Sequence, residues 1–302
     1  MTSGGAGGRG TVVVTGAHSE LGRRAVDRLL AATDDRLVGV TSPWADEPPP
    51  AHPRLTYLPV DLERPLPAEL RDALGAARRV VHFAWIRDPS AARAAERNLA
   101  AIGRLVEPMP SPEWFVLVSS VAASPSARSA YGAAKWRATE RVSELGGTSL
   151  LVGLVVDEPA AGPYAVLAGL VRRLPVSLRF LGAAPSVFPV RGEAVVAAVT
   201  TVVGEDVTPG AYAVFERPPV GLGELLAGLE AATPARRLRV RLPAAVLLAG
   251  ASALKRLRLG PRRRLDQVLT LLYKDDRFLL SLPELPGQRG RDRRALAPAG
   301  AP

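Results

Sequence analysis

The chain has no cysteine, few histidines and very little lysine, and each scarcity excludes a kind of chemistry. Without cysteine, its 302 residues form no disulfide, no thiolate metal site and no thiol nucleophile. The three histidines, His18, His52 and His82, are scattered, so no histidine-based metal site is expected. Lysine occurs only at positions 135, 255 and 274, so arginine supplies nearly all of the positive charge behind the net charge of +10.

Long apolar runs are also missing. The longest candidate, Pro243 to Leu254 (PAAVLLAGASAL), has about a dozen residues, against the roughly 20 that a membrane-spanning helix requires. We interpret it as a packed helix. Residues 1–10 lack the apolar run of a secretory signal and are expected to form a flexible leader. These features favour a cytoplasmic protein with no membrane partner.

Basic residues are densest from Lys255 to Arg264 (KRLRLGPRRR). Arginine in a chain rich in alanine, glycine and proline can reflect coding bias, and the run would then be a solvated helix end and loop. The functional alternative is a dock for a phosphate-bearing substrate or an acidic carrier protein. Nucleic acid is not expected as a partner, because no aromatic residues are interleaved with the arginines.

Short apolar runs alternate with helical patterns in the first half of the chain. The run Thr11–Thr15 (TVVVT) is followed by a glycine and then by a helical pattern from Leu21 to Leu30. Further runs occur at Leu37–Val40, Leu55–Val60, Val80–Ala84 and Trp114–Val118. Alternation of this kind predicts an α/β protein with a Rossmann-type, doubly wound parallel sheet covered by helices on both faces.

The pattern divides the chain into a core and a second lobe. Residues 11–160 are expected to form the dinucleotide-binding core, completed by a helix near Ala130–Leu145 and a strand at Ser149–Val156. Residues 161–288 are expected to form a small, mixed substrate-binding lobe with some elements returning to the core, and residues 289–302 a flexible tail. Within the lobe we predict helices near 165–173, 193–203 and 222–231 and strands near 212–215 and 238–240.

The segment TGAHSELG follows the first strand and opens the first helix, which is where a pyrophosphate-binding turn lies. Gly16 permits the tight turn and Gly22 the close packing of helix on sheet, while the middle position holds Ser19 instead of glycine. A turn of this kind can also be purely structural. The candidate cofactor residues here are Gly16, His18, Ser19, Glu20, Leu21 and Gly22.

The residues after the second and third strands bear on which dinucleotide is bound. NAD-binding proteins place a carboxylate at the end of the second strand, but this chain has Thr41 there and no carboxylate before Asp46. His18 would meet a 2′-phosphate, which favours NADP over NAD, unless it is only a solvent-facing loop residue. Asp61, followed by Leu62, would hydrogen-bond the adenine amino group or cap the next turn.

A second motif, YGAAK from Tyr131 to Lys135, lies on the helix predicted near residue 130. Its spacing puts the phenol and the ammonium on one helix face, and we expect the cation to lower the phenol's pKa. Such a tyrosine transfers protons to or from a substrate oxygen. The preceding strand, FVLVSS, ends in Ser120, whose hydroxyl would bind the same oxygen unless it only caps a turn.

Together these segments, with VVHFAW at Val80–Trp85 and Asn98 opening NLAAIGRLVE, resemble the short-chain dehydrogenase/reductase superfamily, in its extended, epimerase/dehydratase-like branch. The resemblance implies that Tyr131 handles the proton while hydride moves between nicotinamide and substrate. It further implies that Lys135 holds the nicotinamide ribose, that Ser120 orients the substrate and that Asn98 supports the cofactor side. It places Leu62, Phe83, Ala84 and Trp85 beside the cofactor and WIRDP in the substrate cleft, and it implies a homodimer.

Departures from the family pattern limit the substrate. Only ten residues separate Ser120 from Tyr131, and PSVFPVRGEA lacks the arginine clamp of nucleotide-sugar enzymes. We therefore expect a small, less polar substrate such as the ketone or hydroxyl of a secondary metabolite. An epimerase or dehydratase on a sugar-like substrate, a non-redox elimination or cyclisation enzyme, and a non-catalytic dinucleotide-binding regulator are the alternatives.

Overall fold

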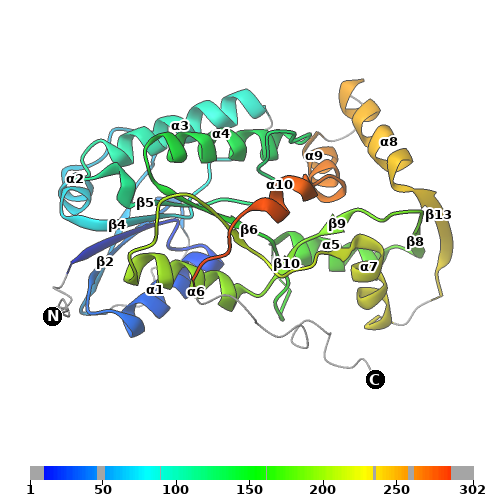
Figure 1. Cartoon of the computed structure of the whole chain (residues 1–302), viewed down its shortest axis with the longest axis horizontal. Coiled ribbons are helices and arrows are strands. Elements are labelled where there is room, and N and C mark those ends of the chain that lie inside the picture. The colour runs from blue at the N-terminus through cyan, green and yellow to red at the C-terminus, as the bar shows by residue number, and fades with distance from the viewer. Residues whose placement is uncertain are drawn as a thin grey trace.

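A parallel sheet forms the centre of the computed structural model, which describes residues 10–45, 52–88, 90–160, 162–233, 236–257 and 262–286 (Figure 1). In the described chain the sheet has seven strands in the order β11-β6-β5-β4-β1-β2-β3, all paired in parallel. The strands are β1 (Thr11–Thr15), β2 (Arg36–Thr41), β3 (Leu55–Pro59), β4 (Ala77–His82), β5 (Phe115–Val118), β6 (Thr148–Val152) and β11 (Ala211–Val214). The predicted doubly wound α/β sheet is confirmed.

Helices cover both faces of the sheet. Because successive side chains of a strand point to opposite faces, Val12 and Val14 pack on one side and Val13 on the other. The first side is covered by α1 (Glu20–Ala32) and α6 (Gly192–Gly204), and the second by α2 (Ala68–Gly75), α3 (Ala91–Val106) and α4 (Ala130–Glu144) (Figure 1). Burial on both faces explains why the strands are continuous β-branched runs.

The second lobe extends from one end of the sheet and has an apolar core of its own around Leu167, Val187 and Leu222 (Figure 1). Its elements include two-stranded pairs instead of a continuous sheet. They are β7 (Leu154–Val155), α5 (Gly162–Arg173), β8 (Val176–Leu181), β9 (Ser186–Val187), β10 (Pro189–Val190), β12 (Val220–Gly221), α7 (Leu222–Ala231), β13 (Leu238–Pro243), α8 (Ala244–Arg256) and α9 (Arg262–Leu272). The last helix, α10 (Asp276–Ser281), returns to the core, where Leu279 packs with Leu151 of β6 and Ala213 of β11. The predicted substrate-binding role of this lobe stays a prediction.

The strand predicted at Ser149–Val156 is two strands. β6 pairs within the central sheet, whereas β7 pairs with β10, and Gly153 lies between them. A Cβ at Gly153 would lie 2.2 Å from the Phe188 carbonyl oxygen, so the backbones cross too closely for a side chain. Sequence patterns also missed α9, as well as β8 and α10, whose partners β13 and β11 are distant in the chain.

The helix predicted within Pro243–Leu254 is observed as the segment Ala244–Arg256, and it packs against α9 over part of its surface. Val246 is 53% exposed and Leu254 is 43% exposed, although the segment contains almost only apolar residues.

None of the described helices is long and apolar enough to cross a membrane. The predicted leader up to residue 9, the tail from residue 289 and part of the arginine-rich run lie outside the described residues.

Candidate active site

The candidate site lies at the carboxyl ends of β1, β4 and β5, which are neighbours in the sheet. The chain order reverses at β1, since β2 continues from it in one direction and β4 in the other. In open α/β sheets, ligands bind outside the carboxyl ends of the strands at such a switch point. The glycine turn follows β1, Trp85 follows β4 and Ser120 follows β5, so the topology brings the two predicted motifs together.

The glycine turn has the tight geometry that its sequence predicts. Gly16 has a φ of +69°, and a Cβ there would lie 2.7 Å from the backbone nitrogen of Ala84. At Gly22 a Cβ would lie 2.2 Å from the Gly16 carbonyl oxygen. Ser19 is the N-cap of α1, and its hydroxyl accepts a hydrogen bond from the Gly22 N–H at 3.1 Å. Serine at the middle position therefore has a structural role of its own.

This turn fits a dinucleotide diphosphate. The two glycines keep Cβ atoms out of the space between β1, β4 and α1, and the amino end of α1 points its N–H groups and its positive dipole end toward an anion. Glu20 is exposed and lies 3.8 Å from Arg24, so its charge is partly compensated. Leu21 packs against the core instead of facing the turn.

The end of β2 offers hydrogen-bonding groups instead of a carboxylate. His18 is exposed, and its Nδ1 accepts a hydrogen bond from the Ser42 N–H at 3.4 Å. Thr41 is buried at the strand end. The described residues 41–45 contain no acidic side chain, and Asp46 lies outside the described residues. This edge therefore presents an imidazole where NAD-binding proteins present an acid.

Asp61 caps the turn after β3. Its carboxylate accepts a hydrogen bond from the Glu63 N–H at 2.9 Å and lies 3.9 Å from Arg64. The capping alternative for Asp61 is thus observed, while its contact with adenine stays a prediction. Leu62 is buried in the core below α2 and α3, so packing accounts for its side chain.

Tyr131 and Ser120 meet at the end of β5. The Ser120 hydroxyl lies close enough to the Tyr131 phenol to favour its ionised form, and Tyr131 lies in the first turn of α4. Ser120 also accepts a hydrogen bond from the Ala122 N–H at 3.2 Å, so its hydroxyl both shapes the following turn and faces the phenol. A serine and a tyrosine hydroxyl in contact can bind one substrate oxygen between them.

The pKa of Tyr131 contradicts the expectation from its spacing. Burial raises the pKa above its ordinary value of 10, and the nearby Ser120 hydroxyl and the positive charge of Arg87 offset this only in part. The charge that lowers the phenol's pKa comes from Arg87 in the loop after β4, which the sequence placed only within WIRDP. The expected effect of Lys135 fails because its ammonium is directed elsewhere. A phenol with a raised pKa is protonated at neutral pH and suits the role of proton donor.

Lys135 is buried without a carboxylate partner in the described chain. Its Nζ donates a hydrogen bond to the Val118 carbonyl at 3.1 Å and lies 4.0 Å from the centre of the Trp85 ring. Burial lowers its pKa to about 7. A cation with only one carbonyl and an aromatic face retains donors for a polar ligand such as a ribose hydroxyl.

Trp85 connects the two catalytic candidates. Its ring meets Tyr131 edge-on, with centroids 6.1 Å apart, and it carries the Lys135 ammonium on its face. Phe83 and Ala84 are half-buried, and their N–H groups bond to Thr15 at 3.0 and 3.4 Å. This strand extension therefore lies directly beside the glycine turn, as the resemblance implies.

His82 belongs to the core. Its Nδ1 lies 2.6 Å from the Thr15 hydroxyl and its ring packs on Phe115. Burial and the nearby Lys135 lower its pKa to about 3, so the ring is neutral over the physiological range. Core packing therefore accounts for this residue.

Asn98 positions the loop after β4. Its side-chain oxygen accepts a hydrogen bond from the Ile86 N–H at 3.0 Å, and its amide donates to the carbonyls of Ile86 at 2.8 Å and Ala94 at 2.7 Å. These three bonds fix the backbone between Trp85 and Arg87. Asn98 is fully buried and is therefore better described as a positioning residue than as a catalytic one.

Asp266 was missed by sequence reasoning. From α9 its carboxylate accepts hydrogen bonds from the N–H groups of Ala130 at 2.6 Å and Tyr131 at 3.1 Å, beside the N-cap Ser129. It thus satisfies the free donors at the start of the helix that carries Tyr131. No local sequence signal reveals this contact, because the two residues are 135 positions apart.

Replacing Asp266 should therefore destabilise the chain. We expect Asp266→Ala to lower the free energy of unfolding by about 1 kcal/mol, as the loss of a helix cap does, measured by urea unfolding. Asp266→Asn keeps an acceptor oxygen and should cost less. Equal stability of Asp266→Ala and the unchanged chain would show that the cap contributes nothing.

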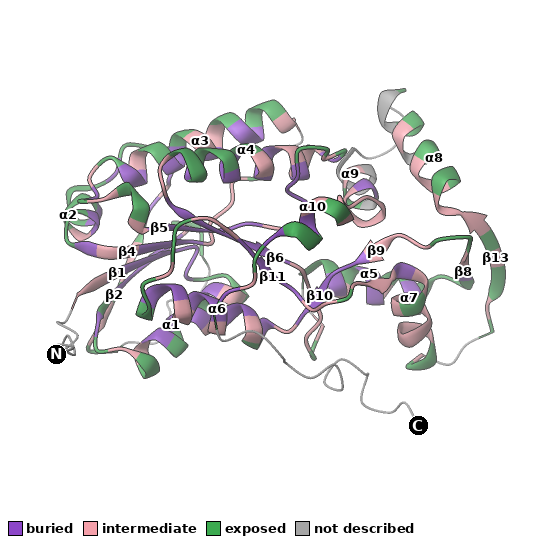
Figure 2. Ribbon diagram, viewed as in Figure 1, coloured by how far each residue is buried: buried purple, intermediate pink, exposed green. Residues whose placement is uncertain are grey.

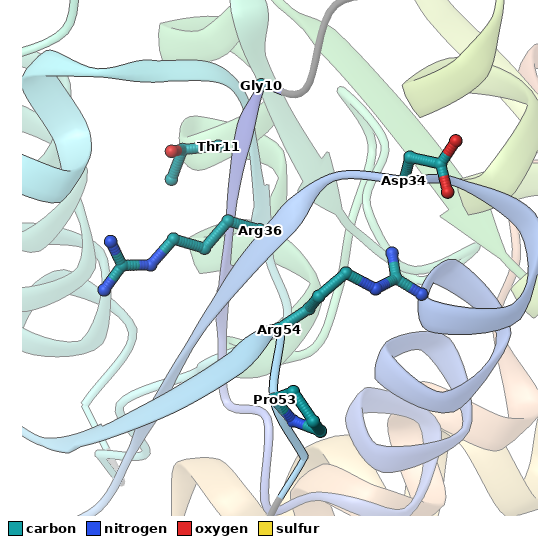
Figure 3. Close-up of a pocket in the computed structure, with 6 residues that line it drawn as sticks. All are labelled: Gly10, Thr11, Asp34, Arg36, Pro53 and Arg54. Carbon is teal, nitrogen blue, oxygen red and sulfur yellow. The ribbon is translucent and has the colours of Figure 1, made fainter.

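A surface hollow occurs at the opposite edge of the sheet (Figure 3). It is lined by residues at the amino ends of β1, β2 and β3, namely Gly10, Thr11, Asp34, Arg36, Pro53 and Arg54. Arg54 donates to the carbonyls of Thr33 at 2.5 Å and Asp35 at 3.2 Å, at the end of α1. Its guanidinium is used structurally, and the hollow lies away from both motifs.

Comparison with solved structures identifies proteins of the same fold. The UDP-glucose 4-epimerase of Thermotoga maritima is 18% identical with a TM-score of 0.60, over 77% of this chain and 85% of that one. The terminal R domain of the myxalamid PKS-NRPS biosynthetic pathway is 18% identical with a TM-score of 0.62, over 88% and 79%. The Bordetella bronchiseptica enzyme WbmH, solved with NAD+, is 16% identical with a TM-score of 0.60, over 87% and 97%.

No protein-family model and no curated protein matches the sequence. At this level of identity the structural likeness establishes the fold. The Rossmann-type α/β fold expected from the sequence is thus shared with these enzymes, whereas membership of the short-chain dehydrogenase/reductase superfamily stays a prediction.

Proposed function

We propose that this chain is an NAD(P)-dependent oxidoreductase of the short-chain dehydrogenase/reductase type, acting at a carbon–oxygen bond. The observation that carries the proposal is the meeting of Ser120 and Tyr131 at the end of β5, with Lys135 one turn later on the same helix. The proteins of the same fold include epimerases and an enzyme solved with NAD+, which supports a dinucleotide-dependent activity.

Each residue of the site has a separate role in binding or in proton transfer. Ser120 and Tyr131 bind the substrate oxygen, and the protonated phenol donates its proton to that oxygen as the carbonyl is reduced. Lys135 binds the ribose next to the nicotinamide ring, and Trp85 excludes water from the pair. The dinucleotide, when bound, supplies or accepts the hydride. Asn98 and Asp266 hold the loop and the helix on which these groups lie.

The substrate is a small ketone or hydroxyl compound, in keeping with secondary metabolism. The loop between Ser120 and Tyr131, which would line the substrate site, is short. The Tyr273 hydroxyl, in the C-terminal segment, donates a hydrogen bond to Ser126 of this loop at 3.0 Å. The second candidate is an epimerase or dehydratase, which the similar structures favour. An epimerase or dehydratase would begin with the reverse step, in which Tyr131 accepts the proton of a substrate hydroxyl and a bound dinucleotide would take up the hydride, so the same residues serve either outcome.

A substrate screen tests this proposal. Purified protein is mixed with NADPH or NADH and a panel of ketones, and with NADP+ or NAD+ and a panel of alcohols, while the absorbance of the reduced nicotinamide is followed. A change that needs both protein and substrate is the expected result. Turnover that survives removal of the dinucleotide would instead indicate the non-redox elimination or cyclisation enzyme.

The cofactor is NADP in preference to NAD. No acid in residues 41–45 repels a 2′-phosphate, and the exposed His18 lies beside the Ser42 backbone at the same edge. We expect His18→Ala to weaken NADPH binding about tenfold, the size of one hydrogen bond to a charged group. NADH affinity should stay within about twofold of its original value. Equal losses for both dinucleotides, measured by fluorescence titration, would remove His18 from cofactor selection.

A further inference from the structure

The helix α8 exposes a continuous apolar stripe. Val246 and Leu254 are 53% and 43% exposed on one face of the helix, and Leu257, directly after its last residue, is 67% exposed. The positions between them on that face are small and exposed as well, namely Ala249, Gly250 and Ala253. Because α8 is apolar on more than one face, it packs against α9 and still turns this apolar stripe to solvent.

The chain around this stripe carries only positive charge. Between Glu230 and Asp266 the sequence contains no acidic residue, whereas it contains arginine at 236, 237, 239, 241, 256, 258, 262, 263 and 264 and lysine at 255. In the structure, the described residues Arg236, Arg239 and Arg241 are exposed. Apolar surface and cationic charge thus occur together over one segment.

The strand before α8 extends the same surface. β13 pairs with β8, and Leu238, which is 70% exposed, lies directly opposite the exposed Val176. Arg239 and Arg241 alternate with apolar residues along β13. Figure 1 places β13 and α8 at the outer end of the second lobe, and Figure 2 shows exposed residues along both. The surface is therefore at an extremity of the molecule, where a flat partner has access.

We propose that β13 and α8 dock the protein on the surface of an anionic lipid bilayer. Helices that lie in the interface bury an apolar face at the level of the headgroups and bind anionic lipid through flanking basic residues. The expectation of no membrane partner rested on the lack of a spanning helix, and a helix lying on the surface does not need that length. This inference is independent of the proposed catalytic activity.

Other occupants fit the charge or the shape less well. A second copy docking through the same surface would bring two uniformly basic segments together, which electrostatic repulsion opposes. An acidic protein would satisfy the charge, but α8 presents a projecting helix face and would need a complementary groove in the partner. A planar anionic surface satisfies the charge, the apolar stripe and the position at the end of the lobe together.

Vesicle co-sedimentation of the full chain tests the proposal. The probes are phosphatidylcholine vesicles with and without about one third phosphatidylglycerol. The protein should sediment with the anionic vesicles and remain in solution with the neutral ones, and added salt should weaken binding. Val246→Glu with Leu254→Glu should lower the partition coefficient at least about tenfold, and Arg239→Glu with Arg241→Glu on the order of tenfold.

A matched control separates the stripe from general surface charge. Val166 and Leu170 on α5 are also exposed, at 52% and 49%, so Val166→Glu with Leu170→Glu makes the same change elsewhere. That variant should bind nearly as the original chain does, and circular dichroism checks that each variant is folded. Three outcomes would overturn the proposal. The first is no binding to anionic vesicles, and the second is an equal loss of vesicle binding in the Val246/Leu254 and the Val166/Leu170 variants. The third is a dimer in solution that disappears only when Val246 and Leu254 are replaced.

Discussion

Tyr131→Phe should lower turnover by roughly 10³-fold, within the range that a positioned general acid contributes. The substitution removes only the hydroxyl, which is the group that contacts Ser120 and whose pKa burial raises. The ring remains in place to meet Trp85, whose centroid lies 6.1 Å away. Dinucleotide affinity should therefore stay within about twofold, measured by fluorescence titration beside the turnover assay.

Ser120→Ala supplies the matching variant for this prediction. It removes the other half of the hydroxyl pair and should also lower turnover, but by less, because the proton donor is retained. Unchanged turnover in Tyr131→Phe would remove the phenol from the mechanism. A loss of dinucleotide binding equal to the loss of turnover would show that Tyr131 serves binding alone.

Lys135→Met should stabilise the free protein at neutral pH while lowering its turnover by a large factor. The pKa of Lys135 is about 7 in the folded chain, below its ordinary value of 10.5. Between these values the unfolded chain holds a proton that the folded chain has lost, so stability falls as the pH falls from about 10 to about 7. The loss amounts to about 1 kcal/mol per pH unit. Methionine has no proton to bind, so the stability advantage of Lys135→Met over the original chain grows as the pH falls over the same interval.

Urea unfolding at a series of pH values between 7 and 10 measures this effect. Lys274→Met is a suitable control, since burial also lowers the pKa of Lys274, to about 8, and its ammonium donates to carbonyls of its own segment, those of Thr270 and Tyr273. Both variants should reduce the pH dependence of stability, but only Lys135→Met should impair turnover and dinucleotide binding. A pH dependence of Lys135→Met that matches that of the original chain would contradict the burial of an uncompensated ammonium.

The core of the fold could be predicted from the sequence because the local apolar pattern and the tertiary structure agree there. Strand Thr11–Thr15 and helix Leu222–Ala231 have the predicted bounds, and the helix carrying Tyr131 differs by one residue. Buried parallel strands are continuous apolar runs, and the glycine turn between β1 and α1 has a fixed geometry. For these elements the chain's own periodicity was sufficient evidence.

The remaining features depend on contacts between distant segments. Nothing near Asp266 in the sequence indicates that it caps the helix of Tyr131, and spacing alone put Lys135 beside the phenol instead of beneath Trp85. The pKa of Tyr131 was misjudged for the same reason, since burial and Arg87 determine it. Helix α8 is a further example of what sequence patterns do not predict. Its apolar composition predicts a helix correctly but does not indicate which of its faces a neighbouring element buries.

The central claim is that a nicotinamide dinucleotide binds with its reactive end beside Trp85, Tyr131 and Lys135. Equilibrium titration of the purified chain with NADPH and with NADH, exciting tryptophan and recording nicotinamide emission, tests it most directly. We expect saturable binding of one dinucleotide per chain, with the transferred emission reduced in Trp85→Phe, because among the four tryptophans this ring lies 4.0 Å from the Lys135 ammonium. If neither NADPH nor NADH binds, the chain is not a nicotinamide-dependent enzyme.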